Sequence, residues 1–277
     1  MNLRERYEQR AAAAAPTFEV PPASEVPGRE DYGWIDFTGL QNTRDLGGLP
    51  AADGRRIKRG LLLRSGSPGF GTQADLERLR TEYDLRLVVD FRSGFELSEL
   101  PDPMDRLPGA RYVHAAIIDE QALGITQDEE SRARERERAQ AEPGYAEQHL
   151  AELYGIFIMN PVGVAGYARF LRELLACERG AALWHCFVGR DRCGIGSALV
   201  QTALGVPEPE QERDYLATNV YAPAEFAPGG FGATRAAIRG AVDAASSEYG
   251  SLMGYIQGAL GITPGELADL RARYLEP

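Results

Sequence analysis

Hydrophobic and polar positions follow two different periods along the chain. Short apolar runs bounded by polar residues or glycine predict buried strands at 85–93, 111–118 and 181–187. Longer stretches, in which apolar residues recur every three or four positions, predict helices at 72–85, 145–158, 162–180 and 194–205. Because strands and helices alternate, the pattern predicts an α/β domain.

The two ends of this pattern differ in composition. Residues 1–30 are rich in alanine, proline and glutamate, and we expect a poorly ordered N-terminal extension there. The alternating pattern occupies residues 31–277, which we expect to form one domain. A charged run at 127–142 interleaves acidic and basic residues, which is more typical of a solvated helix face than of a binding surface.

Composition narrows the class of protein. The 277 residues are 44% hydrophobic and 26% charged, as in globular proteins, and the net charge of −11 argues against a general nucleic-acid or anionic-membrane surface. No apolar stretch reaches the ~20 residues of a membrane span, and the charged N-terminus is unlike a secretory signal. We therefore expect a cytoplasmic protein that neither binds nucleic acid nor inserts into membranes.

Metal and disulfide chemistry are not expected. The three cysteines are too few for a disulfide framework and form no CxxC pair, and the three histidines are scattered without an HExxH motif. Nothing in the sequence implies an organic cofactor. The residues concerned are Cys177, Cys186, Cys193, His114, His149 and His185.

The stretch WHCFVGRDRCG, residues 184–194, combines a thiol with arginines and glycines. Cys186 ends a predicted strand, residues 187–192 form a tight loop, and Gly194 opens the next predicted helix. In this geometry backbone N–H groups and the helix dipole attract an anion, and a thiol held there is expected to be a thiolate. Arg192 adds a planar guanidinium that matches two phosphate oxygens. Together these groups predict nucleophilic displacement at phosphorus.

Other interpretations of this stretch fit less well. A cysteine in a buried strand is usually inert core, as we expect for Cys177, but the Gly/Arg/Asp loop after Cys186 serves no packing purpose. The sequence GRDRCGIG lacks the Lys-Ser/Thr pair of a nucleotide-binding Walker loop. The loop of rhodanese-type sulfurtransferases typically has one residue fewer before the arginine.

The sequence HCFVGRDRCG resembles the His-Cys-x5-Arg loop of the protein tyrosine and dual-specificity phosphatase superfamily. It is more closely similar to the HCFAGKDRTG loop of the bacterial tyrosine phosphatase B family, whose members act on phosphotyrosine, phosphoserine/threonine and phosphoinositides. The resemblance spans residues 34–276 and is specific because further segments occur in the family's order. These are NTRDLGG (42–48), LLLRSGSP (61–68), VVDFRSGFELSELPDP (88–103), DYLATN (214–219) and YGSLMGYI (249–256).

The resemblance implies a protein tyrosine phosphatase-like fold, with a mostly parallel central sheet flanked by helices. It also implies that residues 120–160 form a helical lid insertion over the site. Cys186 is the implied nucleophile. The rest of the loop is implied to bind the phosphate, through Phe187, Val188, Gly189, Arg190, Asp191 and Arg192. His185 and Cys193 are expected to orient the loop.

The proton donor for the leaving group is open among three aspartates. Asp191 lies in the loop, Asp90 ends a strand, and Asp119 stands where many dual-specificity phosphatases carry their acid. We favour Asp191 and Asp90 together as catalytic residues, without assigning either role. The alternative is that they form ion pairs that orient Arg192 or Arg92.

Two loop residues depart from the family. Arg190 replaces a lysine and keeps a positive charge that suits a second anionic group, as in a phosphoinositide headgroup. Cys193 replaces a Thr or Ser, and because a thiol is the weaker hydrogen-bond donor we expect slower phosphocysteine hydrolysis. It also raises the hypothesis of a reversible disulfide with Cys186, the alternative being a chance isosteric change.

The sequence therefore predicts a cysteine-dependent phosphatase that hydrolyses phosphotyrosine proteins, and also phosphoserine/threonine proteins, through a phosphocysteine intermediate. One alternative is a phosphoinositide or small phosphate ester phosphatase. Another, from a different class, is a catalytically weak phosphate-binding module. The expected partner is a phosphorylated protein or a phosphoinositide, and the sequence does not address the oligomeric state.

Overall fold

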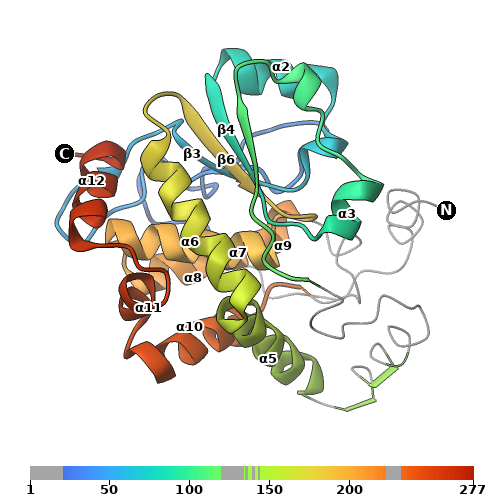
Figure 1. Cartoon of the computed structure of the whole chain (residues 1–277), viewed down its shortest axis with the longest axis vertical. Coiled ribbons are helices and arrows are strands. Elements are labelled where there is room, and N and C mark those ends of the chain that lie inside the picture. The colour runs from blue at the N-terminus through green and yellow to red at the C-terminus, as the bar shows by residue number, and fades with distance from the viewer. Residues whose placement is uncertain (1–20, 120–133, 135–136, 139–140, 143, 223–231) are drawn as a thin grey trace.

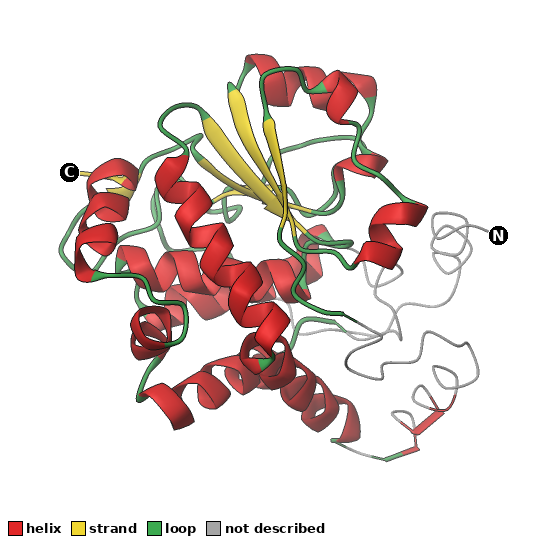
Figure 2. Cartoon of the chain, in the orientation of Figure 1, coloured by secondary structure: helices red, strands yellow, loops and turns green. Residues whose placement is uncertain are grey.

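A five-stranded sheet lies at the centre of the chain, with helices on both faces (Figure 1, Figure 2). The structure is a computed structural model that describes residues 21–119, 134, 137–138, 141–142, 144–222 and 232–277. The strands, in spatial order, are β1 (Arg44–Asp45), β3 (Leu62–Ser65), β6 (Ala181–His185), β4 (Leu85–Asp90) and β5 (Arg111–His114). All neighbours are parallel except β1, which pairs antiparallel with β3. The predicted α/β architecture with a mostly parallel sheet is confirmed.

A second sheet of two strands joins β2 (Arg56–Ile57) to β7 (Leu275–Glu276), so the end of the chain pairs with an early segment. The helices in the N-terminal half of the chain are η1 (Pro68–Phe70), α2 (Gln73–Thr81), α3 (Gly94–Glu99) and η2 (Met104–Arg106). The later helices are α5 (Tyr145–Met159), α6 (Pro161–Ala176), α7 (Asp191–Leu204), α8 (Glu208–Leu216), α9 (Thr218–Tyr221), α10 (Arg235–Tyr249), α11 (Leu252–Gly258) and α12 (Pro264–Tyr274).

The central strands are buried on both faces. Val88 and Leu183 belong to the apolar cluster under α2, whereas Leu87 and Trp184 belong to the larger cluster under α6 and α7. Successive side chains of a strand point to opposite faces, so each strand serves both clusters. This explains why β4 and β6 appear in the sequence as continuous apolar runs rather than as alternating ones.

Local signals set most helix ends. The Thr72 side chain caps α2, and Gly205, with a φ of 81°, ends α7 at the predicted position. The helix predicted to run to Gly180 ends instead at Ala176. Gly180 has a φ of 66° and turns the chain into β6, where a Cβ would lie 2.0 Å from the Asp84 carbonyl oxygen.

The packed part of the chain begins earlier than the predicted domain boundary at residue 31. Residues 21–30, expected to belong to a poorly ordered extension, pack against the domain through Arg29, which is fully buried. Its guanidinium donates hydrogen bonds to the carbonyl oxygens of Gly47, at 2.6 Å, and Tyr32, at 2.7 Å. The packed domain therefore includes residues before 31, and the prediction for residues 1–20 lies outside the described part of the chain.

The interval expected to form a lid contains α5. Its buried side chains Leu150, Tyr154 and Ile158 belong to the main core, and the helix packs along α10 (Figure 1). α5 is thus part of the packed domain, and the lid stays a prediction for residues 120–133, which lie outside the described residues. None of the described helices is long and apolar enough to cross a membrane.

Candidate active site

The predicted loop lies at the carboxyl edge of the parallel sheet. β6 ends at His185, which is in register with Ser65 at the end of β3 and with Asp90 at the end of β4. Cys186 follows directly, and its residue is only 2% exposed. Open parallel sheets collect their ligand sites at this edge, because the loops that follow neighbouring strands meet there.

The peptide groups of the loop are turned in one direction. The Phe187 carbonyl oxygen accepts a hydrogen bond from the Ser67 amide at 2.9 Å, on the outer side of the loop. In a trans peptide the next N–H points the opposite way, so the Val188 N–H faces inward. Gly189 has a φ of 73°, and a Cβ there would lie 2.5 Å from the Ser65 carbonyl oxygen, so only glycine fits.

Helix α7 begins earlier than predicted, at Asp191 instead of Gly194. The Gly194 amide already donates to the Arg190 carbonyl oxygen at 2.7 Å, which closes the first turn. The positive end of the helix dipole therefore lies in the loop itself, a few residues after Cys186. This arrangement favours an anion inside the loop.

Arg192 is oriented by a residue that the sequence analysis did not identify. The Glu96 carboxylate binds both terminal nitrogens of Arg192, with Nη2 2.8 Å from Oε1. Burial lowers the pKa of the Arg192 guanidinium, but Glu96 outweighs this effect and the pKa lies well above its ordinary value. The S-x-x-E pattern of Ser93 and Glu96, a capping box at the start of α3, is the signal that could have drawn attention to Glu96.

Asp191 sits between a cation and a pair of tyrosines. One of its oxygens, Oδ1, accepts hydrogen bonds from Arg190 Nε at 2.8 Å and from the Tyr154 hydroxyl at 2.5 Å. The Tyr154 hydroxyl is in turn 2.5 Å from that of Tyr215, which donates to it. Burial raises the pKa of Asp191, but Arg190 and Tyr154 outweigh this effect and the pKa is lowered. Asp191 is therefore ionised at neutral pH.

The Arg190 side chain forms an ion pair inside the protein. Its side chain is 7% exposed and pairs with Asp191. We expected its positive charge to suit a second anionic group such as a phosphoinositide headgroup. The structure places this charge on the protein's own carboxylate, so it gives that expectation no support.

Asp90 forms an ion pair with Arg92, which the sequence left open as the alternative to a catalytic role. Arg92 binds both of its oxygens, with Nε 2.9 Å from Oδ1 and Nη2 2.7 Å from Oδ2. The Tyr112 hydroxyl donates to Oδ2 at 2.9 Å. The Asp90 and Arg92 side chains are fully buried. A carboxylate held this way orients Arg92 and is poorly placed to exchange a proton with a substrate.

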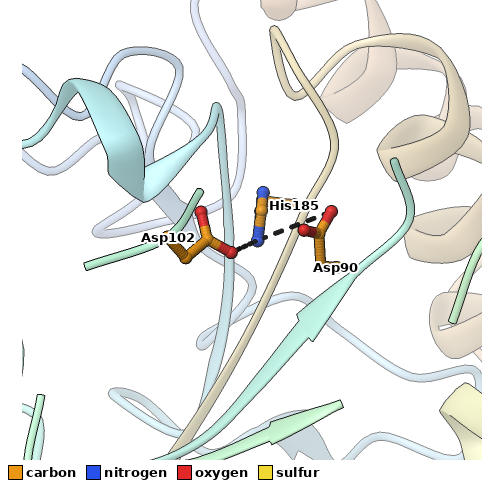
Figure 3. A group of neighbouring side chains, drawn as sticks. All are labelled: Asp90, Asp102 and His185. Carbon is orange, nitrogen blue, oxygen red and sulfur yellow. Dashed lines mark ion pairs between the residues drawn. The ribbon is translucent and has the colours of Figure 1, made fainter. Parts of the chain in front are cut away.

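His185 contacts both the loop and two buried carboxylates. Its Nδ1 lies 3.0 Å from the Cys186 carbonyl oxygen, and its Nε2 lies 2.9 Å from Asp102 Oδ2 and 3.9 Å from Asp90 Oδ1 (Figure 3). Burial lowers the pKa of His185, but Asp102 and Asp90 outweigh this effect and raise it. The imidazole is thus biased toward its charged form under the loop.

The side chains of Asp90, Asp102 and His185 are of types that bind metal ions, and their potential ligand atoms lie within 4.8 Å of one another. The Arg92 guanidinium, however, bonds Asp90 through both oxygens and Asp102 through Nη2 at 2.9 Å. A cation already fills the position between the carboxylates. The cluster therefore fits an ion-pair network rather than a metal ion.

Cys193 is buried beneath the loop. Its Sγ donates to the Trp184 carbonyl oxygen at 3.5 Å, and burial raises its pKa to about 12. Among the described residues, no hydrogen bond joins it to Cys186, and all three cysteines of the chain are free.

Asp119 follows β5 at the same edge of the sheet. The Ala115 and Ile117 amides donate to the carbonyl oxygens of Asp90 and Phe91, so the segment after β5 lies along the end of β4. Asp119 is exposed and is the last described residue before position 134.

A cluster of buried charges lies behind the loop. Three fully buried guanidiniums approach the Asp214 side chain: Arg64 at 2.8 Å, Arg44 at 3.8 Å and Arg29 at 3.9 Å. Burial lowers the pKa of Arg44 to about 9, and the three arginines together hold the pKa of Asp214 below its ordinary value against the effect of burial. Arg44, Arg64 and Asp214 lie in segments that resemble the phosphatase family, but the sequence alone predicts no role for them.

Comparison with known proteins shows the family to which the chain belongs. A sequence profile of the tyrosine phosphatase family matches residues 35–276. The chain is 32% identical to a protein of Cupriavidus necator provisionally named a tyrosine-protein phosphatase, over 98% of both chains. It is also 24% identical to a tyrosine-protein phosphatase of Nostoc commune, over 81% of this chain and 77% of that protein. The chain belongs to the tyrosine phosphatase family and is a phosphoric monoester hydrolase.

Proposed function

We propose that this phosphatase hydrolyses phosphotyrosine in proteins through a phosphocysteine intermediate on Cys186. The observation that carries the proposal is the position of this thiol. It lies between the end of β6 and the start of α7, inside a loop whose helix dipole and oriented arginine both favour an anion.

In the first step the Cys186 thiolate attacks phosphorus. The S–P bond forms as the P–O bond to the tyrosine oxygen breaks, and that oxygen takes a proton from a general acid. Arg192 and the loop amides bind the non-bridging oxygens. Asp119 is the proposed acid, because it is exposed at the substrate edge of the sheet, whereas Asp90 is held by Arg92.

In the second step a water oxygen attacks the phosphocysteine. The S–P bond breaks, the thiolate leaves, and the water proton passes to a carboxylate. Asp191 is the proposed base. Its pKa is lowered, so it is ionised, and its hydrogen bonds to Arg190 and Tyr154 use only Oδ1. No hydrogen bond from another described residue reaches Oδ2, and this oxygen is the proposed acceptor of the water proton.

The wall of the loop favours an aromatic phosphate ester. Phe187 packs with Phe70, Leu100 and Val188 in a small apolar cluster, and the Phe70 and Phe187 rings meet edge to face at 5.4 Å. Phe70 and Val188 are only partly buried. An apolar rim of this kind stabilises a tyrosine ring better than an inositol ring, whose hydroxyls need hydrogen-bond partners.

The test is phosphate release from a phosphotyrosine peptide, a phosphothreonine peptide and a phosphoinositide, with Cys186→Ser in parallel. We expect release from the phosphotyrosine peptide to be fastest and to require Cys186. Faster release from the phosphoinositide would replace the proposed substrate. Oxyanion binding without Cys186-dependent release from any substrate would support the catalytically weak binding module.

A further inference from the structure

Asn42 lies two residues before β1, the edge strand of the sheet, and its side chain contacts the phosphate-binding loop. It is 1% exposed and has a φ of 56°, a left-handed conformation that asparagine, aspartate and glycine tolerate best. Its amide donates to the Tyr221 carbonyl oxygen at 3.0 Å, which fixes the backbone at this point. The side chain is therefore held in one place by the fold around it.

The carboxamide of Asn42 points at two loop carbonyls. Nδ2 donates to the Gly189 oxygen at 2.9 Å and to the Val188 oxygen at 3.3 Å. Its Oδ1 is buried and has no hydrogen-bond partner among the described residues. In a buried side-chain amide, both the NH2 group and the oxygen normally have hydrogen-bond partners. In Asn42 only the NH2 group has them, so the position of this side chain favours donation to the loop.

These bonds decide where the loop amides point. Each trans peptide directs its N–H opposite to its C=O. Holding the Val188 and Gly189 carbonyls on the outer side therefore turns the Gly189 and Arg190 N–H groups inward, beside the Val188 N–H. Arg64 Nη2 also donates to the Gly189 oxygen, at 2.9 Å. The Val188 oxygen, in contrast, receives its only side-chain bond in the described structure from Asn42.

We propose that Asn42 is a positioning residue for oxyanion binding: it keeps consecutive loop amides aimed at the phosphate without touching it. This inference rests on the proposed function, because it assumes that the loop binds the phosphate of the substrate. A carbonyl released from Asn42 can rotate inward, and its negative end then opposes the anion.

Two variants separate this role from a general effect on folding, because both tolerate the left-handed backbone. Asn42→Gly removes the donor at every pH, so the Val188 oxygen loses its side-chain hydrogen bond and the Gly189 oxygen keeps only the one from Arg64. Asn42→Asp replaces the donor with a carboxylate that repels the two carbonyls, and it recovers one O–H donor when it is protonated. The matched control is Asn160→Asp. Asn160 is also buried and donates to backbone carbonyls, but it caps α6 and does not contact the loop.

The experiment is a titration with sulfate, whose charge is constant over the range used, followed through the amide chemical shifts of Val188 and Gly189. It is run between about pH 5 and 8, where a buried carboxyl group can titrate. We expect Asn42→Gly to weaken sulfate binding about 10-fold at all pH values. We expect Asn42→Asp to weaken it by more than Asn42→Gly at pH 8, and to recover affinity toward pH 5, where the protonated carboxyl group supplies one donor to the loop. Asn160→Asp should lower the melting temperature without changing the dissociation constant.

Equal sulfate affinity in Asn42→Asp, Asn160→Asp and the wild type would overturn the inference. The proposed function is tested separately by Cys186→Ser. If that variant still hydrolyses the phosphotyrosine peptide, the proposed function fails. If it is inactive and sulfate binds the wild-type loop, but Asn42→Asp behaves as Asn160→Asp does, only the inference fails.

Discussion

Glu96 binds both terminal nitrogens of Arg192 in a two-bond ion pair, and both side chains are nearly buried. The pair joins the start of α3 to the start of α7, so it fixes the plane of the guanidinium before any phosphate arrives. An arginine that is oriented in advance loses less side-chain entropy on binding.

We predict that Glu96→Gln lowers kcat/KM for a phosphotyrosine peptide about 10-fold or more, mainly through KM, because Arg192 loses its charged partner. Glutamine still completes the capping box with Ser93, so α3 should keep its stability. The measurement is steady-state kinetics together with the melting temperature. Glu99→Gln, on the exposed side of the same helix, is the control. Equal losses in both variants would contradict the orienting role.

The two proposed catalytic aspartates, Asp119 and Asp191, should differ in how their loss depends on the leaving group. Asp119→Asn should lower kcat about 100-fold on a phosphotyrosine peptide and much less on an aryl phosphate with an activated leaving group, which needs no proton. Asp191→Asn should instead slow the second step, so that phosphocysteine accumulates and a burst of phenol release precedes the steady state. Rapid-quench kinetics measures both. A leaving-group dependence seen in Asp191→Asn but not in Asp119→Asn would exchange the roles.

The His185–Asp102 pair predicts a pH dependence of stability. Burial lowers the pKa of His185, but Asp102 and Asp90 raise it above the ordinary 6.5, so the folded state binds the proton more tightly than the unfolded chain does. This contribution to stability is full below pH 6.5 and is lost as the pH rises through the folded-state pKa.

We expect the imidazole NMR titration of His185 to have a midpoint above 6.5, and Asp102→Asn to lower that midpoint. The chain has only three histidines, so the signals are easily assigned. The melting temperature of the wild type should fall from pH 6.5 toward alkaline pH more steeply than that of Asp102→Asn. Asp105→Asn, at an exposed position nearby, should behave as the wild type. An unchanged midpoint in Asp102→Asn would contradict the pairing.

Cys193 should not protect Cys186 from oxidation. A thiol with a pKa of about 12 remains protonated, and attack on an oxidised sulfur requires the thiolate. After peroxide treatment we expect mass spectrometry to find oxidised Cys186 without a 186–193 disulfide. Cys193→Ala should then be inactivated by peroxide at the wild-type rate. A crosslink, or faster inactivation of the variant, would restore the disulfide hypothesis.

The periodicity of the sequence located β4, β5 and β6, the helices α2, α5, α6 and α7, and the position of the loop, because these depend on neighbouring residues. The apolar runs became β4 and β6, and their ends placed Asp90 beside His185. The start of α7 was missed because Asp191 and Arg192 look like loop residues by their polarity. Their first helical turn is closed by a backbone hydrogen bond that no side-chain pattern records.

The pairs that polar side chains form in the folded protein could not be predicted in the same way. Glu96 and Arg192 are 96 residues apart, and Tyr154 and Asp191 are 37 apart, so only the folded chain brings them together. Arg190 is a second example. Its charge suggested that it binds an anionic group of the substrate, but in the folded chain it is buried and paired with Asp191.

The buried charges behind the loop also bear on how the protein is made. Asp214 follows Arg64 by 150 residues and Arg44 by 170, so both guanidiniums leave the ribosome long before their counter-ion does. Burying them without it is strongly unfavourable. The support of the loop can therefore close only after Asp214 has emerged, well after Cys186. A chain synthesised past Cys186 but not as far as Asp214 would carry the nucleophile without the buried ion pairs that support the loop, so the newly made enzyme would become active only after Asp214 has joined the fold.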